Sequence, residues 1–268
     1  MRELVQVDPD TPLDLAARPP DERFGWEREA AEAATMERAE RLAELGTELA
    51  ADGRHGLLVV FQGLDASGKD GAIKRCIGPL NPMMVRATGF TAPAGEELRH
   101  DFLWRIHRAL PGRGRIGAFN RSHYEDVLVP RVELAQPASV WEPRIEAITA
   151  FERHLVQEGT AILKLFLHVS REEQAERLRE RIEDPRKRWK FDAADLAKRA
   201  LYDDYLAAYA DVLRRTSTPW APWHVVPADR KWVRNRLVTE VMIETLEALD
   251  LRPRDLSPDV LEAARAQA

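Results

Sequence analysis

The chain has 268 residues, 44% of them hydrophobic, and a formal net charge of −5. This length allows one large α/β domain or two small ones. The negative charge argues against a protein that binds duplex DNA, so any polyanion site must be local. No apolar run approaches the ~20 residues of a membrane span, and the first residues lack an apolar signal core. The single cysteine, Cys76, excludes an internal disulfide. We therefore expect a cytoplasmic protein without nucleic-acid or membrane partners.

Residues 1–25 are rich in Pro, Asp and Arg and lack periodicity, which predicts an amino-terminal arm lying on the body or partly disordered. A helix is expected over residues 27–51, with an apolar stripe that begins at Met36. The main domain is expected over residues 26–250. Residues 251–268 are expected to form a loose tail.

Five apolar segments, near residues 57, 83, 116, 161 and 223, alternate with helical patterns. This alternation predicts a parallel α/β sheet covered by helices on both faces. Expected helices follow the first strand up to Gly78 and cover residues 96–110, 139–158, 170 onward, 192–215 and 231–249. Capping boxes are expected at Ser139 with Glu142 and at Ser170 with Glu173.

The first strand runs into a glycine-rich loop with the spacing Gly63-x4-Gly68-Lys69. This is the pattern of a Walker A loop, whose backbone N–H groups and helix dipole hold phosphate while the lysine adds a cation. The Ser or Thr that normally follows the lysine is replaced by Asp70, and Asp65 adds a second carboxylate. Two carboxylates beside a polyphosphate would repel it unless a metal ion lay between them. The loop therefore predicts Mg²⁺ dependence.

A second candidate segment, residues 120–126, follows the strand at 116–119 and has the sequence Asn-Arg-Ser-His-Tyr-Glu-Asp. Ligands gather at the carboxyl ends of strands in open α/β sheets, so this segment and the loop should face one crevice. His123 is a candidate ligand contact, with packing inside the loop as the alternative.

A third segment, residues 177–190, carries seven cationic side chains in an acidic protein. A solvated helix end would explain such a run, but the break at Asp184-Pro185 suits a hinge. We therefore favour a mobile lid that closes over a polyanion and excludes water.

Residues 63–71, 120–128 and 184–191 resemble the P-loop, the Walker B-like segment and the lid of the second family of polyphosphate kinases. The resemblance also includes residues 100–105 and 219–223. The resemblance covers residues 30–250. It implies a P-loop kinase fold of three layers, similar to thymidylate kinase, with a helical lid at about 178–200. It also implies reversible, Mg²⁺-dependent transfer of a phosphoryl group between inorganic polyphosphate and adenine or guanine nucleotides. Relatives of this kind are often dimers or tetramers, so a homo-oligomer is expected.

The resemblance assigns roles to individual residues. Catalytic roles fall on Asp65, Lys69, Asn120 and Arg121, with Asp65 and Asn120 at the metal. Phosphate binding falls on Gly63, Ala66, Ser67, Gly68, Lys69, Asp70, Lys74, Arg181, Lys187, Arg188 and Lys190. Nucleotide binding falls on Thr91, Arg121, His123, Glu125 and Arg131.

One departure concerns Asn120, because the family often carries Asp at this position. Asn is a neutral ligand and a poor base, and Asp65, Asp70, Glu125 or Asp126 could hold the metal instead. The segment from Ser122 to Asp126 looks most like class III members, which accept both nucleoside monophosphates and diphosphates. Two alternatives stay open: an ATP-dependent nucleoside monophosphate kinase, which Asp70 disfavours, and a non-catalytic nucleotide or polyanion sensor.

Overall fold

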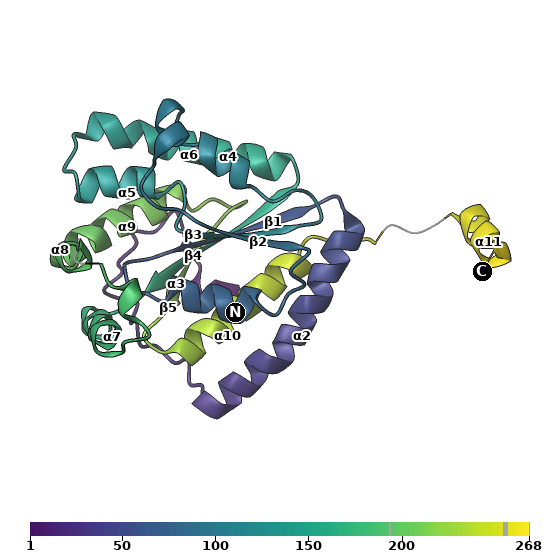
Figure 1. Cartoon of the computed structure of the whole chain (residues 1–268), viewed down its shortest axis with the longest axis horizontal. Coiled ribbons are helices and arrows are strands. Elements are labelled where there is room, and N and C mark those ends of the chain that lie inside the picture. Colours follow the sequence, from purple (N-terminus) through teal and green to yellow (C-terminus); the bar gives the residue numbers. More distant parts are fainter. Residues whose placement is uncertain (193, 254–256, 268) are drawn as a thin grey trace.

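The computed structural model of the chain describes residues 1–192, 194–253 and 257–267. Its centre is a five-stranded parallel sheet in the order β2-β3-β1-β4-β5 (Figure 1). The strands are β1 (Gly56–Gln62), β2 (Val85–Gly89), β3 (Ile116–Asn120), β4 (Thr160–His168) and β5 (Trp223–Pro227). Every residue of β1 is buried, as its unbroken apolar sequence requires of a central strand covered on both faces.

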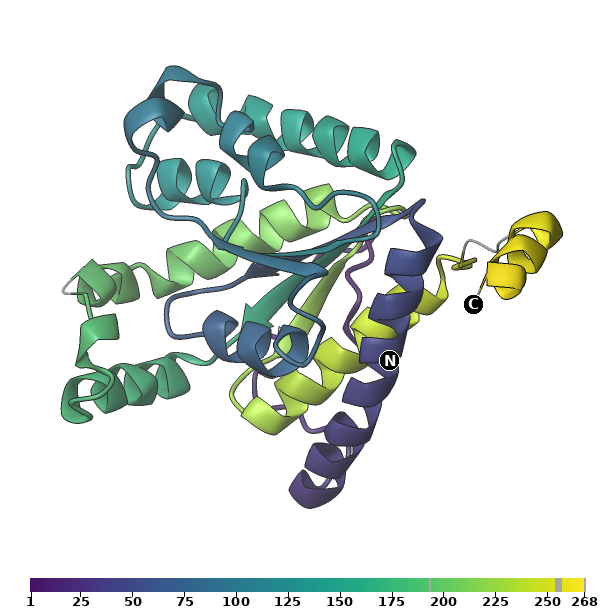
Figure 2. The ribbon, with the colours of Figure 1, turned by 45° about the vertical axis from the view of Figure 1, so that its right-hand side comes forward.

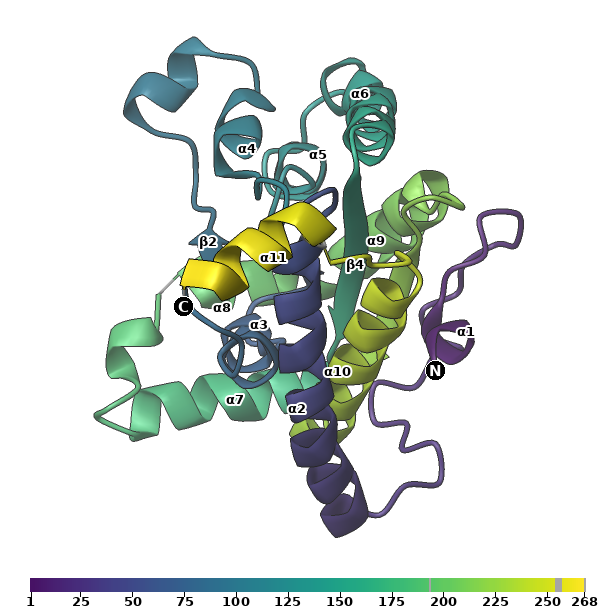
Figure 3. The same ribbon diagram turned by 90° about the vertical axis from the view of Figure 1, so that its right-hand side faces the viewer.

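Two hydrophobic cores flank the sheet, because alternate residues of β1 point to opposite faces. Leu58 and Val60 pack with α4, α5, α6 and α9, and Leu57 and Val59 pack with α2, α3 and α10. Figure 3 shows α4, α5 and α6 on one side of the sheet and α2, α3 and α10 on the other. The helices are α2 (Arg28–Asp52), α3 (Lys69–Ala72), α4 (Trp104–Ala109), α5 (Glu125–Val132), α6 (Ala138–Gln157), α9 (Tyr202–Thr216) and α10 (Lys231–Glu247). The predicted three-layer α/β fold is confirmed.

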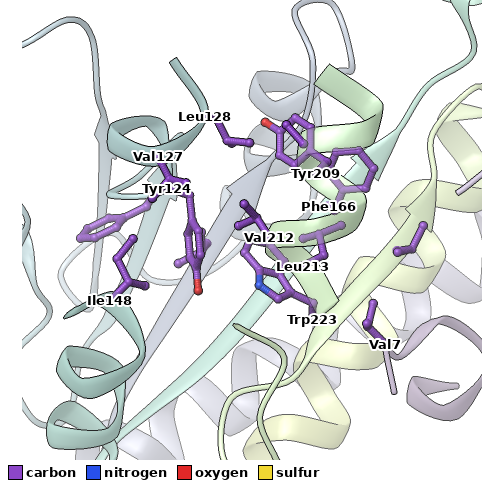
Figure 4. Close-up of a cluster of buried hydrophobic side chains, with 14 of the residues drawn as sticks. Val7, Tyr124, Val127, Leu128, Ile148, Phe166, Tyr209, Val212, Leu213 and Trp223 are labelled. Carbon is purple, nitrogen blue, oxygen red and sulfur yellow. The ribbon is translucent and has the colours of Figure 1, made fainter. Parts of the chain in front are cut away.

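The core on the α6 side is rich in aromatic rings. Tyr124 lies between Ile148 of α6 and Trp223 of β5 (Figure 4). The rings of Tyr124 and Trp223 meet edge to face, with centroids 4.8 Å apart. This arrangement ties the segment that follows β3 to the far edge of the sheet.

The segment predicted as a lid, residues 178–200, projects beyond the sheet at the left of Figure 2. We call it the lid segment. It contains most of α7 (Arg171–Glu183), a 3-10 turn η3 (Arg188–Lys190) and α8 (Ala194–Ala200). As predicted, the helix breaks at Asp184-Pro185: α7 ends at Glu183, and Asp184 caps it.

The amino-terminal arm lies along β5. It begins with a single helical turn, α1 (Arg2–Val5), and then the Val7 N–H donates to the Trp223 carbonyl at 2.8 Å. The Met1 amino group and the Arg2 N–H donate to Glu244 of α10 at 2.9 and 3.0 Å. The arm is therefore ordered against the body, and the domain limits stay a prediction.

Several local predictions were wrong, each for a physical reason. Residues 96–110 do not form one helix: a 3-10 turn η2 (Gly95–Arg99) precedes α4, and Leu98 is exposed rather than packed. The helix expected over 192–215 is broken before Tyr202, whose ring packs into the core. The Ser139 capping box does not form, because α6 begins one residue earlier, after Pro137.

Only one of the two hydrogen bonds of the other capping box forms. Ser170 accepts the Glu173 N–H, while the Glu173 carboxylate pairs with Arg177 instead of the helix start. Met36 is exposed. Helix α5, which contains Pro130, and α11 (Pro258–Gln267) in the expected tail were not predicted. The helix expected after the loop up to Gly78 forms as α3 followed by a π-helical turn η1 (Ile73–Ile77).

Candidate active site

The glycine-rich loop folds back on its own lysine. The Lys69 ammonium donates to the carbonyl oxygens of Gly63 at 2.7 Å and Leu64 at 3.0 Å, and its side chain is 8% exposed. Burial and the neighbouring Arg121 charge lower the pKa of Lys69 to about 8. Gly68 has a φ of +96° and faces Arg234, so a side chain is excluded there for two reasons. The loop thus holds a cation that is poorly solvated and ready for an anion.

Two arginines brace this loop from behind: Arg177, which the sequence analysis counted among the lid cations, and Arg234, which it did not consider. Arg177 of α7 donates to the carbonyls of Ala66 and Ser67, both at 3.0 Å, and also to those of Ala228 and Asp229. Arg234 of α10 donates to the Gly68 carbonyl at 3.2 Å. Because loop carbonyls accept these bonds, the N–H groups of the loop can face a phosphate.

The predicted catalytic carboxylates lie on the same side of the loop. Asp65 forms an ion pair with Arg121, which comes directly after β3. Burial raises the pKa of Asp65, but the charges of Arg121 and Lys69 outweigh it, so the net pKa is lowered and the carboxyl is ionised. Asp70 accepts a hydrogen bond from the Asn120 amide at 2.6 Å. The structure therefore brings all four predicted catalytic residues together.

A cavity of about 470 Å³ opens in front of the loop, and we call it the donor cavity. Its lining joins the P-loop, the end of β3, α7 and the start of α10. The lining residues are Asp65, Ala66, Gly68, Lys69, Asp70, Gly71, Asn120, Arg121, Arg177, Glu180, Arg181, Lys187, Lys231 and Arg234. The basic residues outnumber the acidic ones, so the cavity suits a polyanion despite the negative net charge of the chain.

A second cavity of about 340 Å³, the acceptor cavity, lies on the other side of Arg121. The loop after β2 and helix α5 form its walls. The lining residues are Phe90, Thr91, Ala92, Pro93, Arg105, Arg121, Glu125, Asp126, Val129, Pro130, Glu133, Leu134, Gln136, Arg144 and Lys198. Arg121 lines both cavities, and its φ of +64° turns the chain sharply at the strand end.

Two of the predicted nucleotide-binding residues lie away from the two cavities. His123 is fully buried and contacts Glu152, so it cannot reach a ligand. Arg131 pairs with Asp211 at 2.7 Å and covers the Trp141 ring, and it lines neither cavity.

Other predicted phosphate contacts have only partial support. Lys74 is exposed outside the donor cavity, and Arg188 donates to the Ile182 carbonyl. Ser67 is buried, and its carbonyl accepts from Arg177. The side chain of Lys190 falls outside what the structure describes.

The cavities also include residues that the sequence analysis overlooked. Lys231 and Arg234 follow β5 and belong to the donor cavity. The strand-end rule that selected Asn120 could have found them. Arg105, Arg144 and Lys198 belong to the acceptor cavity, and they come from α4, α6 and α8. No local sequence signal places those helices around one cavity.

The oxygen-bearing side chains of the donor cavity fit a Mg²⁺ ion that is shared with a ligand. Among the residues described, no group of three or more His, Cys, Asp or Glu is placed to hold a metal alone. Asp65, Asp70 and Asn120, whose side chains carry oxygen atoms, nevertheless line the donor cavity. Mg²⁺ usually binds one or two carboxylates, several waters and substrate phosphates rather than a complete protein cage.

The fold and this site define a P-loop phosphotransferase. The family model for polyphosphate kinase 2 (PPK2) matches residues 25–253, and the chain belongs to this family. An AMP/ADP-polyphosphate phosphotransferase of Meiothermus ruber is 46% identical over 249 residues, which cover 92% of this chain and 93% of that protein. An ADP-polyphosphate phosphotransferase of Rhodopseudomonas palustris is 44% identical over 82% of this chain and 80% of that protein.

A solved structure agrees with these relatives. The crystal structure of polyphosphate kinase 2 from Arthrobacter aurescens TC1 superposes with a TM-score of 0.92 at 38% identity, covering 99% of this chain and 96% of that one. The predicted family and P-loop kinase fold are therefore confirmed, and the chain is a kinase-type enzyme. No helix in the described part of the chain is long and apolar enough to cross a membrane.

Proposed function

We propose that this enzyme transfers the terminal phosphoryl group of inorganic polyphosphate to AMP and ADP, in a reversible and Mg²⁺-dependent reaction. One observation carries the proposal: Arg121 lines both the donor cavity and the acceptor cavity. A residue in this position can contact a phosphoryl group as it passes from one cavity to the other. The names of the relatives supply the phosphoryl donor, polyphosphate, and the acceptors, AMP and ADP.

The donor end of polyphosphate would lie against the loop N–H groups and the Lys69 ammonium. Arg181 of α7 and Lys187 of the lid segment line the same cavity and would contact the chain farther out. When Mg²⁺ is bound by Asp65 and Asp70, it would neutralise charge on the phosphate oxygens. Asn120 donates to Asp70 and would orient that carboxylate.

The acceptor nucleotide would enter beside the Thr91 loop, with its terminal phosphate toward Arg121. An oxygen of this phosphate attacks the terminal phosphorus of polyphosphate, and the bridging P–O bond breaks. The products are a nucleotide longer by one phosphate and a polyphosphate shorter by one. Arg121 would stabilise the charge on the transferring group. Its guanidinium donates a hydrogen bond to the Glu125 carboxylate at 3.3 Å.

Phosphoryl transfer to a nucleotide competes with transfer to water. The lid segment reaches both cavities, because Lys187 lines the donor cavity and Lys198 lines the acceptor cavity. Closing it over both substrates would exclude water and complete the set of cations.

The test is an assay with purified protein, Mg²⁺ and long-chain polyphosphate, with AMP or ADP supplied separately and products separated by chromatography. We expect ADP from AMP and ATP from ADP, with loss of both products when the metal is chelated. Product from ADP alone would restrict the acceptor range. Activity with ATP and AMP but not with polyphosphate would replace the proposal by an ordinary nucleoside monophosphate kinase. Saturable binding without turnover would indicate a sensor.

Two further points of the proposal need separate measurements. GMP and GDP should serve as acceptors in the same assay, because we expect guanine as well as adenine nucleotides. Light scattering on the purified protein should give the mass of a dimer or tetramer, since we expect a homo-oligomer.

A further inference from the structure

A cluster of charged and polar side chains lies fully buried directly behind the Arg121 turn. Glu152 of α6 is its centre, and its carboxylate contacts the Lys164 ammonium at 2.6 Å, the Tyr124 hydroxyl at 2.8 Å and His123 Nε2 at 3.2 Å. Glu152, Lys164, His123 and Tyr124 are each at most 1% exposed. None of the four lines the donor or acceptor cavity.

Stability alone does not explain this cluster. A buried ion pair loses about as much solvation free energy as it gains from attraction, and well-packed apolar residues often stabilise a protein equally well. The ionic form is nevertheless favoured here: burial opposes ionisation of Glu152, but Lys164 and His123 outweigh it and lower the pKa of the carboxyl. Apolar residues could stabilise the core equally well, but they could not fix the orientation of their neighbours. The polar cluster can do so, because hydrogen bonds are directional.

The direction of its bonds points to the turn that carries Arg121. His123 and Tyr124 follow Arg121 by two and three residues, and both place a polar atom on the same carboxylate. On the other side, the Arg121 N–H donates to the Phe61 carbonyl of β1 at 3.0 Å. Arg121 itself has a φ of +64°, which a residue with a side chain rarely adopts without outside support.

The cluster is also anchored independently of the turn. The Lys164 ammonium donates to the Thr216 carbonyl at 2.7 Å and to the Tyr124 hydroxyl at 3.0 Å. Lys164 belongs to β4 and Thr216 ends α9, so two rigid elements fix the position of the carboxylate. The ring of Tyr124 is confined between Ile148 and Trp223 (Figure 4).

We propose that Glu152 is a positioning residue for catalysis: through His123 and Tyr124 it holds the strained turn that aims the Arg121 guanidinium between the two cavities. The inference rests on the proposed function, because the transfer reaction supplies its readout. Glu152 touches no substrate, and Lys164 serves to keep it ionised in the core. A small displacement of a charge-stabilising group lowers the rate strongly, whereas substrate binding depends on many other contacts.

The test uses two variants that cut the turn from the cluster and one matched control. Tyr124→Phe removes the hydroxyl, and His123→Phe removes Nε2 while keeping an aromatic ring; His123 Nδ1 has no hydrogen-bond partner to lose. Tyr202→Phe is the control, because it removes a buried hydroxyl that donates to the Val169 carbonyl at 2.9 Å. Tyr202 lines neither cavity.

Turnover of the unaltered enzyme with polyphosphate and AMP is measured first, so failure of the proposed function would be seen separately. We expect kcat to fall about tenfold in Tyr124→Phe and His123→Phe, with the KM of both substrates within about twofold. Tyr202→Phe should lose similar thermal stability and keep its kcat. An unchanged kcat in the two turn variants, or an equal loss in Tyr202→Phe, would overturn the inference.

A double-variant measurement separates positioning from general loosening. If Tyr124 acts through Arg121, adding Tyr124→Phe to the Arg121→Lys variant should change kcat less than about twofold. A further tenfold loss in that background would show that the two residues act independently, and the positioning role would be wrong.

Discussion

Replacing Lys69 with methionine tests the most unusual feature of the site, a cation buried among backbone carbonyls. The structure lowers the pKa of this lysine from 10.5 to about 8, a difference that corresponds to about 3 kcal/mol of unfavourable charge burial. Methionine fills similar space without the charge. We expect the variant to lose at least about 100-fold in turnover, because the ammonium would act mainly on the transferring phosphoryl group.

Stability should respond in a different way. The variant is relieved of the buried charge, but it leaves the carbonyls of Gly63 and Leu64 without their donor, at about 1–3 kcal/mol each. These two effects have opposite signs at pH 7. The folded lysine deprotonates from about pH 8, and the unfolded one only near 10.5. The penalty is therefore complete below pH 8 and is relieved as the pH rises, so the wild type gains stability relative to the variant.

The assay is urea unfolding of both proteins at pH 7 and pH 9.5, together with turnover at pH 7. The free energy of unfolding of the wild type minus that of the variant should rise by about 2 kcal/mol between the two pH values. A difference that does not change with pH would refute the depressed pKa. Near-normal turnover would refute the role of Lys69 in the reaction.

Three further predictions concern the lid, the loop and the core. Lys187→Ala should raise the KM for polyphosphate about tenfold and leave the KM for AMP within twofold in steady-state kinetics. The control is Arg186→Ala, because the Arg186 side chain is 90% exposed and lies outside the donor cavity. Equal effects of the two variants would contradict the assignment of Lys187 to polyphosphate binding. Gly68→Ala should lose about 2 kcal/mol in urea unfolding, because its Cβ would lie 2.3 Å from Arg234 and its φ is +96°; unchanged stability would argue against this geometry. Burial lowers the pKa of His224 to about 4, so its contribution to stability should be complete above pH 6.5 and fall by about 3 kcal/mol as the pH drops to 4. His224→Asn should flatten that pH dependence and a similar slope in both proteins would exclude this histidine as the cause.

The sequence predicted the sheet and the P-loop well because both depend on local patterns. A buried apolar run followed by glycines at fixed spacing can hardly form anything other than a strand, a turn and a helix. The same holds for residues 120–121, which follow the next buried strand and meet the loop through Asp65 and Asp70. The ends of neighbouring parallel strands must lie together, so no long-range information was required.

The acceptor cavity was much less predictable. Arg105, Arg144 and Lys198 line it from three separate helices, and their sequence positions carry no signature of a shared site. His123 failed for the opposite reason. Its place at a strand end suggested a ligand, but the following turn directs its ring inward to Glu152, 29 residues away. Arg131 likewise found its partner, Asp211, on a distant helix.

The helix errors share one cause, the priority of packing over propensity. Leu98 fitted an apolar stripe, yet the chain turns at residues 100–103 before α4 begins, so the stripe is interrupted. No helix was expected over residues 125–132, yet α5 forms there with Pro130 inside it and buried.

Because Cys76 is buried, the enzyme has no reactive native thiol that would compete with site-specific labelling. Its side chain is 2% exposed, and burial raises the pKa of the thiol to about 11, so almost no thiolate exists at neutral pH to react with a maleimide. As the chain has no other cysteine, an introduced one becomes a unique attachment point. Arg186→Cys would place a fluorophore on the outside of the lid segment. Its movement during turnover could then be followed by fluorescence without first removing a native thiol.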